Sequence, residues 1–343
     1  MSVKSYTTLG GTASEVKVAK VAHGLMNMHV AANVTPDETC FETIKAGVDL
    51  LPPGAKMILN SGDFYDNNHG PGNLEMVSRF FEKHPEYAER TFLSVKPPYL
   101  PAILSEAFSR PENLRQSVEG INAILRGKKR LDLFQCARVD PDTPIDDVMQ
   151  TLRGFVREGL FDHIGMSECS AATLRKANAV HPIALVEIEV SPWSMEEETK
   201  KVLAATQELG IAVAAYSPLG RGFLTGSIKS LDDIPEGDWR RGLTRFSPEN
   251  FQHNFVLVDA LKAIAEKKGM TPAALCIAWV ATLGPKVIPL PGSSSPQRHV
   301  QNVLAGDVEI TPEESAKIWE VVNGFKVKGD RYFGDDKALR LWG

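Results

Sequence analysis

Short apolar runs alternate along this chain with longer segments in which apolar residues recur at helical spacing. This alternation is the pattern of repeated βα units around a parallel sheet. Eight parallel strands close a barrel, so the sequence predicts an α/β fold of the (β/α)8 TIM-barrel type. The eight runs that qualify as strands are residues 16–22, 57–60, 91–95, 131–136, 163–166, 185–190, 212–216 and 287–289.

Segments of helical period separate these runs, and two helix starts carry explicit signals. Thr35-Pro36 and Thr311-Pro312 each precede two acidic residues, which places a capping hydroxyl, a proline and first-turn negative charge in order. The expected helices are residues 39–47, 74–83, 115–125, 145–158, 171–178, 196–209, 256–267 and 272–281.

The length of 343 residues is compatible with two average domains, but an α/β barrel of this size can form one unit. We predict a single domain over residues 1–343, with 324–343 as a carboxy-terminal loop or tail. Residues 220–251 also exceed an ordinary connection, and both segments could be substrate loops at the carboxyl end of the strands or disordered chain. In residues 220–251, Trp239, Phe246 and Phe251 favour a packed loop. The tail, with Tyr332, Phe333 and Trp342, is compatible with either a packed loop or disordered chain.

The net charge of −5, without a basic tract, argues against a nucleic-acid or membrane-surface binder, so a small molecule is the expected partner. The sequence shows no targeting segment and no 18-residue apolar run, and its four cysteines suggest reduced thiols in a cytoplasmic setting. Their spacing fits no metal site, and HExxH, GxSxG, P-loop and Rossmann motifs are missing. We expect no metal, and the sequence leaves the oligomeric state undetermined.

Polar residues follow several of the expected strands, where barrel enzymes place their sites. Tyr65 follows the second strand, Lys96 closes the third, and Ser167 and Glu168 close the fifth. A lysine within about 4 to 6 Å of a phenol favours the phenolate, so the tyrosine can give a proton near neutral pH, which suits carbonyl reduction. The ordinary alternative is a half-buried packing tyrosine beside a solvated lysine.

Four stretches carry a resemblance to the aldo-keto reductases. Residues 60–65 resemble the DTAxxY stretch of that family, 93–96 its strand-end lysine, and 210–226 its seventh strand and following loop. Residues 287–293, followed by Arg298, Gln301 and Asn302, are similar to its NADPH segment. The resemblance covers about residues 15–325. It implies a (β/α)8 barrel that binds NADPH without a Rossmann domain, and a catalytic set of Asp, Tyr, Lys and His.

Two of those four positions differ here. Tyr65 and Lys96 match, whereas Asn60 occupies the aspartate position and Ala137 the histidine position. We expect Asn60 to remove a negative charge beside Lys96, so that the lysine's field on Tyr65 is less compensated while the lysine loses help in staying protonated. Substrate orientation would then come from His69, Asn67 or Asn68, or from an ordered water.

The resemblance also implies the cofactor contacts. Ser167 and Glu187 would hold the nicotinamide carboxamide, with Glu187 in place of the common Gln and Glu168 in place of the common Asn, and Tyr216 would stack on the ring. Arg298 would pair with the 2′-phosphate, which favours NADP over NAD. The pyrophosphate and the rest of the nucleotide would lie against Ser217, Leu219, Gly220, Gly222, Ser293, Gln301 and Asn302.

Asn60 together with residues 137–140 most resembles the fungal pyridoxal reductases, which reduce pyridoxal to pyridoxine with NADPH. We therefore expect NADPH-dependent reduction of pyridoxal, with the proton from Tyr65 assisted by Lys96. The alternatives are a broad-specificity aldehyde reductase and a non-catalytic NADPH-sensing binding protein.

Overall fold

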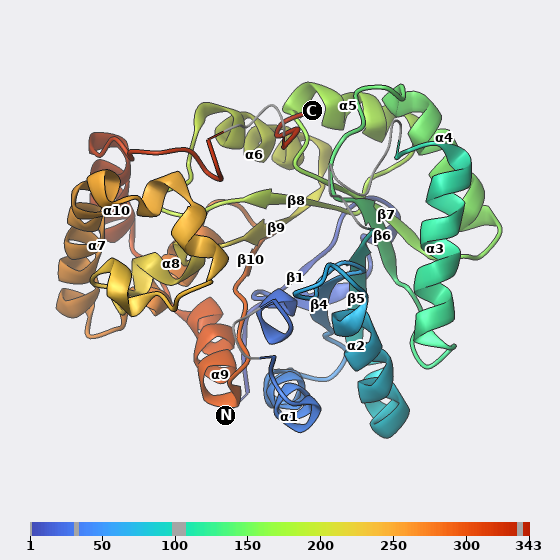
Figure 1. The fold of residues 1–343 in the computed structure, drawn as a ribbon, viewed down its shortest axis with the longest axis horizontal. Helices are drawn as coiled ribbons and strands as arrows, with labels where there is room; N and C mark the ends of the chain where they lie inside the picture. The colour runs from blue at the N-terminus through green and yellow to red at the C-terminus, as the bar shows by residue number, and fades with distance from the viewer. Residues whose placement is uncertain (1, 31–33, 98–107, 335–338) are drawn as a thin grey trace.

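The computed structural model describes residues 2–30, 34–97, 108–334 and 339–343, and its centre is a set of parallel strands surrounded by helices (Figure 1). Within those ranges one sheet runs in chain order from β3 to β10, each strand parallel to the next. The predicted (β/α)8 barrel is confirmed. Its strands are β3 His23–Gly24, β4 Met57–Gly62, β5 Thr91–Lys96, β6 Leu133–Cys136, β7 His163–Ser167, β8 Leu185–Glu189, β9 Ala212–Tyr216 and β10 Val287–Leu290.

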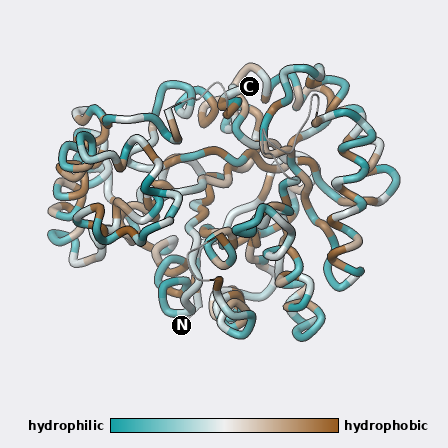
Figure 2. Tube along the Cα trace, in the orientation of Figure 1, coloured by the Kyte–Doolittle hydropathy of each residue, from teal (hydrophilic) through white to brown (hydrophobic). Residues whose placement is uncertain are grey.

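The barrel closes between its first and last strands. The backbone N–H of Gly24 donates to the carbonyl of Pro291 at 3.0 Å, and that of Ala22 donates to Pro289 at 2.9 Å. Hydrophobic residues concentrate on the central strands, and hydrophilic residues on the outer turns of the helices (Figure 2). The sheet therefore buries both faces, as a parallel sheet requires.

The helices have the bounds α1 Asp37–Val48, α2 Gly72–Lys83, α3 Pro111–Leu125, α4 Ile145–Arg157, α5 Ala171–Val180, α6 Glu197–Leu209, α7 Pro248–Lys268, α8 Pro272–Ala281, α9 Pro296–Leu304 and α10 Pro312–Gly324. Thr311 caps α10 as predicted, because its hydroxyl accepts from the N–H of Glu314. The signal before α1 works differently: Pro36 is the N-cap residue, and no side chain caps the helix.

The first predicted strand was wrong in its location. Residues 16–22 contain β2 Lys17–Ala19, which pairs antiparallel with β1 Tyr6–Thr8 in a hairpin, and the barrel strand starts only at His23. Leu9 and Ala13, in the turn of this hairpin, are buried in the same apolar cluster as the barrel residue Ile58. The hairpin covers the amino-terminal end of the barrel, so its apolar residues are buried as deeply as those of a barrel strand.

The two long segments both pack on the barrel. Residues 220–251 form short 3-10 helices (η4 Gly220–Thr225, η5 Leu231–Asp233, η6 Trp239–Gly242 and η7 Thr244–Phe246) and enter α7. Phe246 and Phe251 are buried around Phe223, so the packed loop is the correct interpretation. Residues 339–343 lie beside α5 in Figure 1, where the N–H of Ser170 donates to the carbonyl of Gly343 at 3.3 Å.

Across the described ranges, no helix has the length and apolar character needed to cross a bilayer.

His23 and His299 form a buried stack where the barrel closes. Their ring centroids are 3.7 Å apart, and Nε2 of His23 hydrogen-bonds the carbonyl of Ser293 at 3.0 Å. Burial lowers the pKa of His23 to about 4, although the hydrogen bond to Ser293 opposes the shift. Burial, with the neighbouring His23, lowers the pKa of His299 well below its ordinary value. Both rings are neutral in the folded protein at neutral pH.

We expect acidification to destabilise the protein through this pair. The unfolded chain protonates both rings near pH 6.5 while the folded protein does not, so stability present above pH 6.5 is lost as the pH falls toward 4. Each histidine should cost about 2 kcal/mol of unfolding free energy at pH 5. Urea unfolding at pH 7.5 and pH 5.0 measures the difference. His299→Asn should reduce it and the exposed control His69→Asn should not; equal differences in all three proteins would contradict the assignment.

Candidate active site

Asn60, Tyr65 and Lys96 meet at the carboxyl end of the barrel. Asn60 lies in β4 and Lys96 ends β5, and these two strands are paired. Tyr65 follows β4 in a turn in which its N–H donates to the carbonyl of Gly62 at 3.2 Å. All three side chains are buried, and Nζ of Lys96 lies 5.4 Å from the centre of the Tyr65 ring. The tyrosine is thus held beside the ammonium inside the barrel.

The ammonium of Lys96 is held by a carboxylate from across the barrel. Nζ donates to both oxygens of Glu187, at 2.9 Å each, and to Oδ1 of Asn60 at 2.8 Å. Asn60 in turn donates through Nδ2 to Oε2 of Glu187 at 2.6 Å, and Gln135 donates to the same oxygen at 2.7 Å. The expectation that Asn60 leaves Lys96 without a compensating charge is therefore wrong, because Glu187 in β8 supplies that charge.

These contacts set the protonation of the pair. Burial opposes the charged form of Lys96, but the Glu187 carboxylate and the Tyr65 hydroxyl outweigh it and raise the pKa of the lysine. Burial raises the pKa of Tyr65, and Glu187 adds to the rise while Lys96 opposes it. The site therefore holds a protonated lysine beside a protonated tyrosine at neutral pH, and the expected lowering of the tyrosine pKa by Lys96 does not outweigh burial.

The sequence analysis did not identify Gln135 as a site residue, and it did not predict that Glu187 pairs with Lys96. Both lie within otherwise apolar strands, Gln135 in β6 and Glu187 in β8, and both are buried. For Glu187 the available signal was a charged residue inside an apolar run, since a buried carboxylate is rarely left unpaired. For Gln135 it was an amide in the same kind of run.

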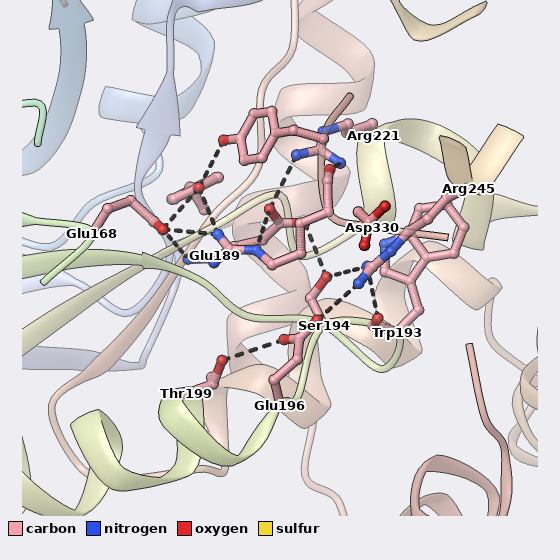
Figure 3. A network of polar contacts seen from close by, with 12 residues as sticks. Glu168, Glu189, Trp193, Ser194, Glu196, Thr199, Arg221, Arg245 and Asp330 are labelled. Carbon is pink, nitrogen blue, oxygen red and sulfur yellow. Dashed lines mark hydrogen bonds and ion pairs between the residues drawn. The ribbon is translucent and has the colours of Figure 1, made fainter. Parts of the chain in front are cut away.

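A second group of buried charges surrounds Glu168 and Glu189, at the ends of β7 and β8 (Figure 3). Oε1 of Glu168 accepts from the hydroxyl of Tyr216 at 2.8 Å and from Arg331 at 2.9 Å. Oε2 of Glu189 accepts from Arg331 at 3.1 Å and from Arg221 at 3.0 Å. Burial opposes ionisation of Glu189, but Arg221 and Arg331 outweigh it and lower its pKa to about 2.

The carboxy-terminal segment completes this group. Arg331 is buried between the two glutamates, and the hydroxyls of Tyr332 and Tyr216 are 2.9 Å apart. The Arg221 guanidinium lies 4.6 Å from the centre of the Tyr332 ring. Figure 3 also shows Arg245 fixing the neighbouring loop through Ser194 at 2.7 Å and Glu196 at 2.8 Å.

The expected pyrophosphate loop is a tight turn with left-handed backbone at several residues. Ser217, Gly220 and Gly222 all have positive φ, at 51°, 54° and 94°. A Cβ on Gly220 would lie 2.8 Å from Nε1 of Trp193, so only glycine fits there. Leu219 is half-buried beside them. The N–H groups of Gly220 and Gly222 already donate to the carbonyls of Ser217 and Leu219, at 2.9 Å and 3.0 Å, so what the glycines offer a phosphate is close approach of the backbone.

The remaining expected cofactor residues follow β10. Ser293 is buried in the connection to α9, Asn302 is buried in that helix, and Gln301 is exposed on it. Arg298 is exposed in the first turn of α9 and pairs with no carboxylate of the described residues. A free guanidinium at a helix N-terminus fits a phosphate.

Three of the expected nicotinamide contacts are already engaged by the protein. Both oxygens of Glu187 bind Lys96, and Glu168 and Tyr216 bind each other and Arg331. One buried oxygen of Glu168, Oε2, has no partner among the described residues, and Ser167 is buried next to it at the end of β7. These two groups fit a carboxamide better than Glu187 does.

The position expected for the family histidine offers no side-chain hydrogen bond. Ala137 is buried, and its carbonyl accepts from Nη1 of Arg138 at 2.6 Å. The suggested substitutes Asn67, Asn68 and His69 are exposed in the loop after Tyr65.

The sequence matches the model of the aldo/keto reductase family over residues 20–323. It is 34% identical over 321 residues to a probable pyridoxal reductase of Schizosaccharomyces pombe, covering 92% of this chain and 95% of that protein. It is 37% identical over 334 residues to an NADP(+) aldo-keto reductase of the same yeast, covering 92% of each. An aldo-keto reductase of Strobilurus tenacellus is 36% identical over 78% of this chain and 79% of its own.

Two solved structures share the fold. A glycerol dehydrogenase from Gluconobacter oxydans superimposes with a TM-score of 0.77 at 24% identity, covering 95% of this chain and 97% of its own. A thermostable aldo-keto reductase superimposes with a TM-score of 0.69 at 18% identity, covering 93% and 100%.

We expect Arg331→Met to lower the unfolding free energy at pH 7 by about 3–5 kcal/mol, because it leaves Glu168 without its guanidinium partner and Glu189 with one fewer. The deficit should shrink toward pH 4, where an unpaired buried carboxylate can take up a proton. Urea unfolding at both pH values measures it. Arg175→Met, which breaks an exposed pair with Glu208, is the control and should change stability by no more than about 0.5 kcal/mol. A deficit no larger than the control's would contradict the role of Arg331.

Proposed function

Because the chain belongs to the aldo/keto reductase family, whose members typically use NAD(P)H, we propose that it reduces an aldehyde with NADPH. We propose pyridoxal as the substrate and pyridoxine as the product. The observation that carries the proposal is the buried Tyr65 beside the Lys96 ammonium, at the end of the barrel where this fold places its active sites.

The chain's own groups account for the proton. Tyr65 donates its hydroxyl proton to the carbonyl oxygen of the aldehyde as that oxygen gains negative charge. Lys96 stabilises the tyrosinate that is left, because its buried ammonium lies 5.4 Å from the centre of the tyrosine ring. Asn60 holds the ammonium in place through its Oδ1. NADPH, when bound, supplies the hydride.

The residues present fit that cofactor. The loop of Ser217, Leu219, Gly220 and Gly222 would take the pyrophosphate, and Arg298 the 2′-phosphate. Ser293, Gln301 and Asn302 would line the nucleotide end. Ser167 and the free oxygen of Glu168 would hold the carboxamide, beside Tyr216.

Pyridoxal is supported by one relative, the probable pyridoxal reductase that is 34% identical over 92% of this chain. The sequence resemblance of Asn60 and residues 137–140 to the fungal pyridoxal reductases supports the same substrate. Broad aldehyde reduction and NADPH sensing without turnover are the competing outcomes of the tests below. The cytoplasmic location suggested by the cysteines remains a prediction.

Tyr65→Phe should lower kcat for aldehyde reduction by about 10²-fold or more, because it removes the proton donor and leaves the barrel intact. The decrease in NADPH absorbance with pyridoxal, benzaldehyde and an aliphatic aldehyde measures turnover, and fluorescence titration measures NADPH binding. The exposed Tyr6→Phe is the matched control.

A kcat/KM highest for pyridoxal supports the narrow substrate, and similar values for all three aldehydes replace it with broad specificity. Tight NADPH binding without turnover by the wild-type protein would overturn the enzyme assignment in favour of an NADPH sensor.

Arg298→Met should raise the KM for NADPH by about 10- to 100-fold and leave the KM for NADH nearly unchanged, because only NADPH carries the 2′-phosphate. Steady-state kinetics with each cofactor measure the two KM values. Arg153→Met, an exposed arginine on α4, is the control. An equal rise for both cofactors would show that Arg298 does not read the 2′-phosphate.

A further inference from the structure

The buried ammonium of Lys96 contacts two side chains, the neutral amide of Asn60 and the carboxylate of Glu187, and only Glu187 can supply a counter-charge. Asn60 and Glu187 both contact Nζ and also contact each other, with Nδ2 of Asn60 2.6 Å from Oε2 of Glu187. The three groups close a ring of hydrogen bonds that contains one positive and one negative charge.

We propose that Glu187 is the positioning residue that keeps Lys96 protonated and aimed at Tyr65, and that it does not contact the nicotinamide. This inference rests on the proposed reduction chemistry and assigns the ionic partner within that site.

The hydrogen bonds to Glu187 support this role. Its Oε1 accepts from Lys96, and its Oε2 accepts from Lys96, Asn60 and Gln135. The carboxylate is buried with 4% of its surface exposed, so water does not solvate it to any useful extent. Donors of the protein already occupy most of its acceptor positions, and little is left for a ligand amide.

The ring also explains why position 60 is neutral. A carboxylate there would stand about one hydrogen-bond length from Glu187 in a buried site, and two like charges at that distance do not both ionise. The amide of Asn60 avoids this, because its oxygen accepts from Lys96 while its nitrogen donates to Glu187. The site needs one carboxylate, and either position reaches Nζ.

Moving the charge within the ring tests the proposal. Glu187→Gln should lower kcat/KM for aldehyde reduction at pH 8 by about tenfold or more and move the basic limb of its pH profile about one unit toward acid, because Lys96 then loses its proton more easily. The double variant Asn60→Asp/Glu187→Gln returns one carboxylate to Nζ and should restore both values to near wild type. Glu208→Gln, on the exposed face of α6, is the matched control.

Cofactor binding separates the two roles of Glu187. If it serves Lys96, Glu187→Gln should leave the dissociation constant for NADPH within about threefold of wild type. A large loss of NADPH affinity with an unmoved pH profile would overturn the proposal, and so would a double variant no more active than Glu187→Gln.

A stability cycle tests the pair without any turnover. Glu187→Gln should lower the thermal midpoint of the wild-type protein, which then holds an unpaired ammonium. In the Lys96→Met background the same change should raise the midpoint, because it removes a buried carboxylate that has lost its partner. The same sign in both backgrounds would overturn the pairing. If the cycle behaves as expected but no aldehyde is reduced, the proposed function fails and the ionic assignment stands.

Discussion

The ammonium of Lys96 constrains the rest of the candidate active site. An ion inside a parallel barrel loses its hydration, and the protein must replace that hydration with a counter-charge and hydrogen-bond partners of good geometry. Glu187 brings the charge from the opposite side of the barrel, and Asn60 and Gln135 orient it. Strands β4, β5, β6 and β8 are thus joined through one polar cluster within an otherwise apolar interior.

At the carboxyl end of the strands, buried carboxylates are in turn neutralised by buried cations. There the buried ions in need of partners are the carboxylates of Glu168 and Glu189, and the cations come from outside the sheet. Arg221 enters from the loop after β9, and Arg331 enters from the carboxy-terminal segment. The two clusters lie next to each other along β8, since Glu187 and Glu189 are two residues apart on that strand and so point to the same face.

The sequence predicts most of the barrel strands, because the spacing of apolar residues shows which residues are buried. It places seven of the eight barrel strands, and it fails at residues 16–22 because a strand covering the barrel end is as apolar as one inside it. The contents of the site depend on tertiary contacts. The proximity of Tyr65 and Lys96 can be predicted, because they lie at the ends of neighbouring strands. By contrast, Glu187 lies 91 residues from Lys96 in the sequence, and Arg331 lies 163 residues from Glu168. No local pattern encodes such pairings.

The separation between Glu168 and Arg331 has a consequence for biosynthesis. A ribosome that has made every barrel strand has reached only Leu290, and at that stage Glu168 has no guanidinium from the carboxy-terminal segment. The sheet can begin to assemble during translation, but a nascent chain that closes the mouth too early would bury an uncompensated carboxylate. Completion of this end of the barrel therefore waits until Arg331 has been synthesised, and a chain truncated before that residue leaves Glu168 and Glu189 without its guanidinium.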